Sequence, residues 1–162
     1  MLKSIIIDDE LKSRESLRIL IEDFCTGVEV SALCQNVSEG IAAIDKYKPD
    51  VIFLDIQMQR ETGFDLLNKI SAINFEVIFT TAYSEYAIRA FKFSAIDYLL
   101  KPIDIEELKA SLLKVEKKIG GSITGRLEQL MDNLKGGNTE NFKLALPTSD
   151  GLIFIKVNDI VY

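Results

Sequence analysis

The sequence predicts a doubly wound α/β domain in which helices cover both faces of a five-stranded parallel sheet. Two features predict this class: five short runs rich in β-branched residues, and intervening stretches whose apolar residues recur every three or four positions. Strands that alternate with helices are joined by crossover connections, which place the strands parallel in one sheet. The 162 residues suffice for one such domain and a small appendage.

Each predicted strand is a short apolar run that suits burial on both faces of a parallel sheet. Valine, isoleucine and aromatic side chains dominate these runs, as is typical of strands. The five runs are Lys3–Ile7, Val28–Cys34, Val51–Leu54, Glu76–Thr80 and Ala95–Leu99.

The stretches that follow these runs have helical spacing. Apolar residues three and four positions apart form one face of each predicted helix, and we expect that face to pack on the sheet. The faces consist of Leu17, Leu20, Ile21 and Phe24; Ile41, Ile44 and Tyr47; Gly63, Leu67 and Ile70; Ala87, Ala90 and Phe91 in the short stretch Glu85–Phe93; and Ile105, Leu108, Leu112, Val115 and Ile119.

The chain changes character after about residue 120. GGSITG interrupts the last helix, Arg126–Leu134 has the spacing of a short amphipathic helix, and KGGNTEN is typical of a linker. The final 21 residues contain two strand-like runs around a turn at Ser149–Gly151, and two strands alone are only marginally stable. We therefore expect them to open a second domain. The predicted boundaries are 1–120 for the first domain, 121–140 for the linker and its short helix, and 141–162 for the fragment of the second domain.

The composition suits a folded protein and excludes several classes of function. Hydrophobic residues make up 48% of the chain, and the 27% of charged residues is not a disordered composition. The net charge of −6 is opposite in sign to that of most free-standing nucleic-acid binders. The chain has no histidine, which excludes histidine zinc sites and catalysis by Ser-His-Asp or Cys-His groups.

The cysteines and the lengths of the apolar runs indicate in which cellular compartment the protein is expected. Cys25 and Cys34 occur without a C-x-x-C motif and are expected to be reduced core residues. Asp8 interrupts the first apolar run, so the start of the chain is unlike a signal peptide, and no run approaches the ~18 residues of a membrane helix. We expect a soluble cytoplasmic protein.

Charged and hydroxyl side chains follow four of the five predicted strands, and parallel strands end at the same edge of a sheet. We therefore expect these groups to meet at that edge, where ligands of such folds bind. Carboxylate oxygens suit a hard cation such as Mg²⁺, and a carboxylate beside the cation is able to attack a phosphoryl group. A lysine and a hydroxyl would then share the charge of the phosphoryl oxygens. In chain order, the residues are Asp8, Asp9, Asp55, Thr81 and Lys101.

Taken singly, these residues have simpler explanations. The acids Asp8–Glu10 are well placed to cap the first helix, and Asp55 is placed to cap another. Thr81 is an ordinary strand-end hydroxyl, and Lys101 an ordinary charge before a loop. The coincidence of all of them on strands of one sheet favours the joint site, with a capping role retained for Glu10.

The motifs DD near the start, VIFLDIQM, a Thr-Ala pair and DYLLKP resemble, in this order, the receiver domain of bacterial two-component response regulators. The resemblance covers residues 1 to about 118 and implies a flavodoxin-like sheet of order 2-1-3-4-5. It implies that Asp55 accepts a phosphoryl group from a sensor histidine kinase. It also implies Mg²⁺ as cofactor, held by Asp9 and Asp55, by Asp8 directly or through water, and by the main-chain carbonyl of Gln57.

The same resemblance assigns a switch. Lys101 would pair with the phosphoryl oxygens, Thr81 would move to hydrogen-bond one of them, and Tyr98 would follow Thr81 inward. Pro102 stands where the family commonly has a cis peptide bond. One residue departs from the pattern: the family commonly has proline four residues after the phosphoacceptor, and this chain has Gln59, which predicts a less stiff loop.

The resemblance extends to the expected output. The stretch FTTAYSEYAIRAFKFSAIDYLLKPI is most similar to receivers attached to LytTR-type DNA-binding domains, and the last 21 residues resemble the opening strands of such a domain. The full-length protein is therefore expected to bind DNA and regulate transcription, whereas residues 1–162 are not. A homodimer through the fourth helix, fifth strand and fifth helix is expected on phosphorylation, although Leu113 is the only obvious extra apolar residue for it.

Two other functions compete with this one. One is a Mg²⁺-dependent phosphatase or phosphotransferase that forms an aspartyl-phosphate while acting on a separate substrate. Such enzymes place a second aspartate two residues after the nucleophile, and Gln57 occupies that position here. The other is an interaction module without phosphorylation, which the intact acids and Lys101 disfavour. We therefore expect no enzyme activity beyond the chain's own phosphorylation and dephosphorylation.

Overall fold

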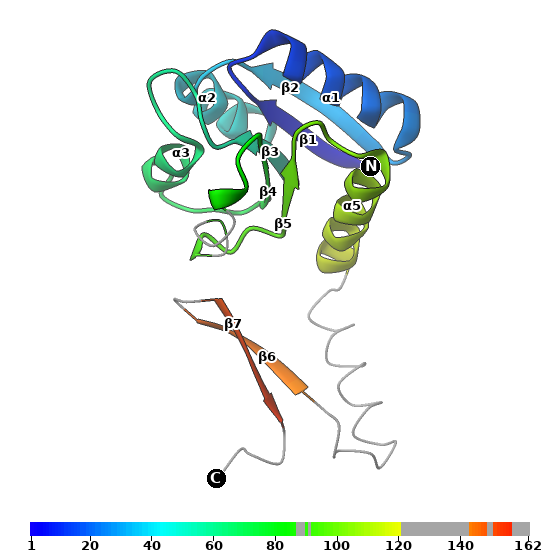
Figure 1. Cartoon of the computed structure of the whole chain (residues 1–162), viewed down its shortest axis with the longest axis vertical. Coiled ribbons are helices and arrows are strands. Elements are labelled where there is room, and N and C mark those ends of the chain that lie inside the picture. Colours follow the sequence, from blue (N-terminus) through cyan, green and yellow to red (C-terminus); the bar gives the residue numbers. More distant parts are fainter. Residues whose placement is uncertain (87–89, 91, 121–142, 149–150, 157–162) are drawn as a thin grey trace. The chain divides into compact units, whose positions relative to one another are not determined.

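The computed structural model describes residues 1–86, 90, 92–120, 143–148 and 151–156 (Figure 1). The chain divides into two compact units, Met1–Glu116 and Lys117–Tyr162. The first unit holds the five-stranded sheet and the residues of the predicted site.

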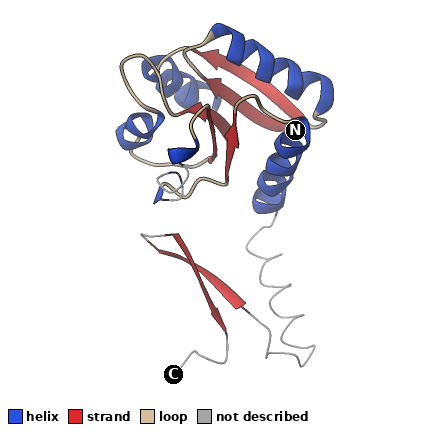
Figure 2. Cartoon of the chain, in the orientation of Figure 1, coloured by secondary structure: helices blue, strands red, loops and turns tan. Residues whose placement is uncertain are grey.

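Five parallel strands form the sheet of the first unit, in the order β2-β1-β3-β4-β5, which confirms the predicted class and topology (Figure 2). The predicted runs agree with the strands to within two residues, and the largest difference is the later start of β5. The strands are β1 (Leu2–Ile7), β2 (Val28–Cys34), β3 (Val51–Asp55), β4 (Glu76–Thr81) and β5 (Asp97–Leu100).

Helices cover both faces of this sheet, with α2 and α3 on one side and α1 and α5 on the other (Figure 1). The predicted fourth helix begins as a 3₁₀ turn, η1 (Ser84–Tyr86), and residues 87–89 and 91 of that prediction lie outside the described residues. The helices are α1 (Leu11–Phe24), α2 (Val37–Tyr47), α3 (Gly63–Lys69) and α5 (Ile105–Gly120).

Alternation along the strands separates two hydrophobic clusters. In β1, Ile5 and Ile7 face α2 and α3, while Ile6 faces α1 and α5. All three side chains are buried, as the apolar run predicts for a strand covered on both faces. The central strands are thereby fixed in position, and so are the residues that follow them.

Two apolar side chains predicted to pack on the sheet are exposed instead. Phe24, the last residue of α1, is 51% exposed, and the half-buried Cys25 that follows it packs against the hydrophobic cluster. Ile119 is 44% exposed. It lies in the last turn of α5, after the buried residues Leu108, Leu112 and Val115 of that helix.

The structure also bears on the cysteines, on membrane spans and on the C-terminal strands. Cys25 and Cys34 are free cysteines, and Cys34 is buried. Within the described residues, no helix combines the length and apolar character that a membrane span requires. In the second unit, β6 (Lys143–Thr148) and β7 (Gly151–Lys156) form an antiparallel hairpin, as predicted. The short helix predicted at 126–134 lies outside the described residues.

Candidate phosphoryl-transfer site

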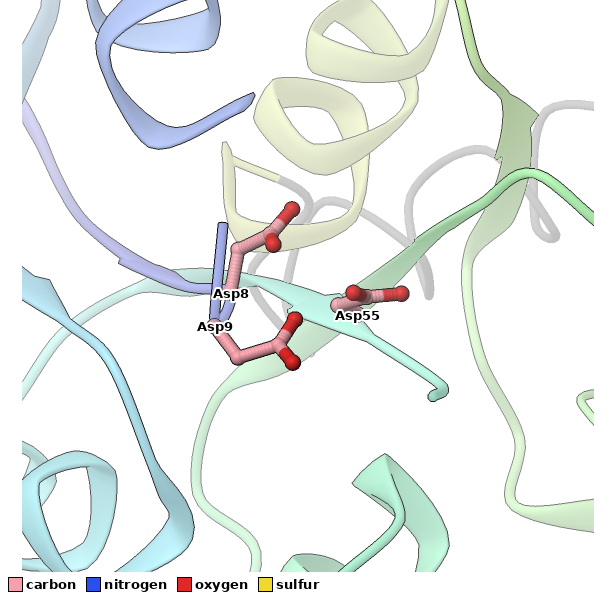
Figure 3. A group of neighbouring side chains, drawn as sticks. All are labelled: Asp8, Asp9 and Asp55. Atoms are coloured by element: carbon pink, nitrogen blue, oxygen red, sulfur yellow. The ribbon is translucent and has the colours of Figure 1, made fainter. Parts of the chain in front are cut away.

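Three carboxylates meet at the carboxyl edge of the sheet. β1 and β3 are neighbours with Ile7 paired to Leu54, so Asp8 at the end of β1 comes to lie beside Asp55 at the end of β3. Carboxylate oxygens of Asp8, Asp9 and Asp55 lie within 4.8 Å of one another (Figure 3). The predicted acid cluster is therefore present, and sheet register explains it.

Two of these acids are almost fully enclosed. Asp8 is 3% exposed and Asp55 is 4% exposed, whereas Asp9 is partly exposed. Burial raises the pKa of Asp55 to about 7, and the charge of Asp8 adds to the effect. Such a cluster of buried negative charge favours a cationic partner.

Lys101 supplies positive charge that partly balances the buried carboxylates. It follows β5, and its Nζ lies 2.7 Å from Oδ2 of Asp8 and 3.4 Å from Oδ2 of Asp55. Burial lowers the pKa of Lys101, but the hydrogen bond to Asp8 and the charge of Asp55 outweigh it and leave the pKa above its ordinary value. The Lys101–Pro102 peptide bond is cis, as the sequence resemblance implied.

Thr81 and Tyr98 meet at the loop after β4. Thr81 is fully buried, and its Oγ1 accepts a hydrogen bond from the backbone N–H of Tyr83 at 3.2 Å. The half-buried Tyr98 donates its hydroxyl hydrogen to the carbonyl oxygen of Tyr83. Burial raises the pKa of Tyr98. Both predicted switch residues thus bind the main chain of one loop residue.

Gln57 lies in the loop between β3 and α3 and makes a contact that the sequence did not predict. Its side-chain amide Nε2 donates to the hydroxyl of Tyr86 in the 3₁₀ turn, at 2.8 Å. The ring of Tyr86 also lies near the ring of Tyr83, edge to face, with the centroids 6.2 Å apart. The loop beside the acid cluster is therefore linked to the segment after β4.

Asp9 and Asp55 line a cavity of about 480 Å³, which leaves space for a small ligand beside the acid cluster. Gln59, which stands where the family commonly has proline, is part of its wall. The lining residues are Asp9, Glu10, Asp55, Gln57, Met58, Gln59, Thr62, Ala82, Tyr83 and Lys101.

The donor set fits a hard divalent cation. Mg²⁺ prefers oxygen ligands and usually keeps several waters, so a few carboxylates beside an open cavity suit it. The alternative that these acids cap α1 is not supported. Glu10 is the N-cap residue, yet its side chain makes no capping hydrogen bond, and the first turn of α1 contains no acidic residue.

Two residues that the sequence did not assign to the site lie against the main chain of its acids. Nη1 of Arg14 donates to the main-chain carbonyl oxygen of Asp8 at 2.6 Å. Gly63 begins α3 so close to β3 that a Cβ atom there would lie 2.5 Å from the carbonyl oxygen of Asp55. The signals in the sequence were a basic residue one turn into the helix after the acidic loop, and a glycine at the start of a helix.

The receiver family accounts for this arrangement. The sequence pattern described as "Response regulator receiver domain" matches residues 5–113. The chain belongs to this family. Receivers of this kind act in two-component signalling, and the matched region contains the acid cluster, Thr81, Tyr98 and Lys101.

Relatives of this receiver include named regulators. The chain is 34% identical over 166 residues to the sensory transduction protein LytT of Bacillus anthracis, covering 100% of the chain and 65% of that protein. It is 41% identical over 119 residues to the transcriptional regulatory protein BtsR of Escherichia coli (strain K12), covering 73% of the chain and 49% of that protein. The receiver chain therefore spans about half to two thirds of the length of these relatives.

A solved structure of similar fold is the response regulator protein TrrA of Thermotoga maritima, in complex with Mg²⁺ and BeF. The match has 26% sequence identity and a TM-score of 0.63, and it covers 71% of this chain and 99% of that one. The fold of the first unit is thus that of a known receiver.

Proposed function

We propose that this receiver accepts a phosphoryl group on Asp55 from a sensor histidine kinase, with Mg²⁺ as cofactor. The observation that carries the proposal is the cluster of three carboxylates within 4.8 Å, with Lys101 bound to two of them. Asp8, Asp9 and Asp55 would hold the cation, and the main-chain carbonyl of Gln57 would add a further oxygen. When bound, Mg²⁺ would neutralise charge on the acids and the phosphoryl oxygens.

The reaction is a transfer from nitrogen to oxygen. An oxygen of Asp55 attacks the phosphorus of a phosphohistidine, the phosphorus–nitrogen bond breaks, and the imidazole leaves with its electron pair. The product is an aspartyl-phosphate. The ammonium of Lys101 lies 3.4 Å from Asp55, close enough to pair with an oxygen of the transferred group.

The hydrogen bonds at the loop after β4 support the switch. Thr81 Oγ1 now accepts from the N–H of Tyr83, and Tyr98 donates to the carbonyl of the same residue. If Thr81 turns towards a phosphoryl oxygen, the first bond is lost, and the loop is released from one of its two ties. Tyr98 would then move inward, and the surface around β5 would change.

The output of the switch would lie in the longer protein. We propose that the hairpin β6–β7 opens a LytTR-type DNA-binding domain and that a phosphorylated dimer aligns two such domains on DNA. Similarity to LytT over the whole chain supports this assignment. We place the protein in the cytoplasm and expect residues 1–162 alone not to bind DNA.

Phosphorylation is tested directly with a small donor. Incubation with Mg²⁺ and acetyl phosphate should add the mass of one phosphoryl group, and Asp55→Asn should abolish the gain. Asp23→Asn, which removes an exposed carboxylate on α1, is the matched control and should leave the gain intact. No gain, or a gain that survives Asp55→Asn, would reject the proposal. Turnover of an unrelated phosphomonoester would instead favour the phosphatase alternative.

A further inference from the structure

The turn between β1 and α1 carries two of the three acids, and α1 lacks the usual device that fixes such a turn. The N-cap of α2, Asn36, accepts a hydrogen bond from the N–H of Glu39, and α3 begins with a capping box between Thr62 and Asp65. The N-cap of α1, Glu10, makes no side-chain capping bond. Other contacts must therefore fix the direction of the acids.

Arg14 provides such a contact. From the first turn of α1, its Nη1 donates to the carbonyl oxygen of Asp8 at 2.6 Å, a short charge-assisted hydrogen bond. The backbone N–H of Arg14 donates to the carbonyl of Glu10 at 3.1 Å, which is the first main-chain bond of α1 and does not depend on the side chain. The contact that depends on arginine at this position is therefore the bond to the Asp8 carbonyl oxygen.

The carbonyl that Arg14 binds belongs to the peptide unit joining Asp8 to Asp9. The carboxylate of Asp8 is itself fixed, with Oδ1 accepting from the N–H of Glu10 at 2.9 Å and Oδ2 lying 2.7 Å from Lys101. The direction of the Asp9 carboxylate then depends on the orientation of the shared peptide. The bond from Arg14 to the Asp8 carbonyl oxygen restrains that orientation.

We propose that Arg14 is a positioning residue for the cation site: it binds the Asp8 carbonyl and so orients Asp8 and Asp9 as ligands. The proposal rests on the proposed function, because it concerns the same Mg²⁺ site. Groups that hold metal ligands from behind typically change metal affinity 10- to 100-fold when they are removed. Arg14→Met should therefore raise the dissociation constant for Mg²⁺ about 10-fold.

The chain offers a matched control one turn further along α1. Arg18 is paired with Glu15 at 2.6 Å and with Glu22 at 2.8 Å, so Arg18→Met removes the same charge and the same side-chain type without touching the acidic turn. Calorimetric titration with Mg²⁺ alone should give Arg18→Met an affinity within about twofold of the native protein. Arg14→Lys keeps a cationic donor and should recover most of the affinity lost in Arg14→Met.

A purely structural role for Arg14 makes a different prediction. It would lower the stability of Arg14→Met in metal-free buffer while leaving its Mg²⁺ affinity equal to that of Arg18→Met. That result would overturn the proposal, as would a failure of Arg14→Lys to recover affinity. Absence of Mg²⁺ binding by the native protein would instead count against the proposed function itself.

A measurement on the native chain covers the case in which Arg14→Met does not fold. Side-chain N–H signals of the two arginines are followed by nuclear magnetic resonance during a Mg²⁺ titration. The signals of Arg14 should shift with the same dissociation constant that calorimetry gives, and those of Arg18 should not. Unchanged Arg14 signals at saturating Mg²⁺ would contradict the proposed coupling.

Discussion

Asp55 combines the chemistry of a nucleophile with a location that disfavours its charge. In the unfolded chain its carboxyl group loses its proton near the ordinary pKa of 3.8, whereas burial and Asp8 raise the folded pKa to about 7. Between these two pH values the folded state holds more protons than the unfolded state, so the contribution of Asp55 to stability falls as pH rises. An uncharged side chain of the same shape should remove this cost.

We therefore expect Asp55→Asn to raise the free energy of unfolding by about 2 kcal/mol in metal-free buffer at about pH 8. The gain should shrink as pH falls from about 7 and vanish below about 4, and urea unfolding across this range measures it. Mg²⁺ should stabilise the native protein and have little effect on the variant, because binding to the folded state adds stability. Asp23→Asn should show no such pH-dependent gain, and an equal gain there would refute the explanation.

At the scale of elements, the junction of β3 and α3 lies directly against Asp55, the proposed phosphoacceptor. Gly63 donates its N–H to the carbonyl of Ile56 at 2.8 Å, and a Cβ atom at Gly63 would lie 2.5 Å from the Asp55 carbonyl oxygen and 2.9 Å from Cγ of Leu54. The Asp55 carbonyl belongs to the main chain of β3 in the centre of the sheet, so neither that carbonyl nor the start of α3 moves easily to make room for a Cβ atom. Helix α3 approaches β3 this closely only with glycine at this position.

Gly63→Ala should therefore lower the free energy of unfolding by about 2 kcal/mol and slow phosphorylation by displacing Asp55. Gly120→Ala is the matched control, because a Cβ atom at the end of α5 meets nothing within 4 Å. Denaturant unfolding and the rate of mass gain with acetyl phosphate measure the two effects. Equal free energies of unfolding for the two variants would show that the close approach of α3 to β3 does not require glycine at position 63.

The sequence predicted the strands well where burial of apolar side chains alone determines their position. Ile5–Ile7 and Val51–Leu54 are apolar throughout, and strands of this kind fit only the centre of a parallel sheet. Asp8 and Asp55 were predicted to meet because sheet register alone brings strand ends together. Contacts that depend on loop conformation, such as the bond from Gln57 to Tyr86, have no periodic signal and were missed. The exposure of Phe24 was missed because helical spacing does not show that α1 ends there and that Cys25 packs against the core.

At the scale of the whole molecule, the described part of the proposed dimer face consists of β5 and α5, and most of the exposed side chains of α5 are charged. Leu113, the extra apolar residue on α5, is 53% exposed but lines a groove with Phe24 of α1. Beside β5, Lys114 binds Asp97 at 3.0 Å. Leu100 is 42% exposed at the end of the strand. Contacts across this face would therefore be largely electrostatic.

A dimer of this kind should be weak and sensitive to salt, because exposed charge pairs are screened over about 8 Å at physiological ionic strength. With Mg²⁺ and beryllofluoride as a phosphoryl mimic, the solution mass should double at low salt and return to the monomer value at about 0.5 M salt. Asp55→Asn should stay monomeric throughout. Leu113→Gln tests which face is used: it should leave the dimer intact, because the groove that Leu113 lines is formed with the end of α1 and contains no residue of β5. Loss of the dimer in Leu113→Gln, or a mass that the mimic does not change, would contradict the proposed output.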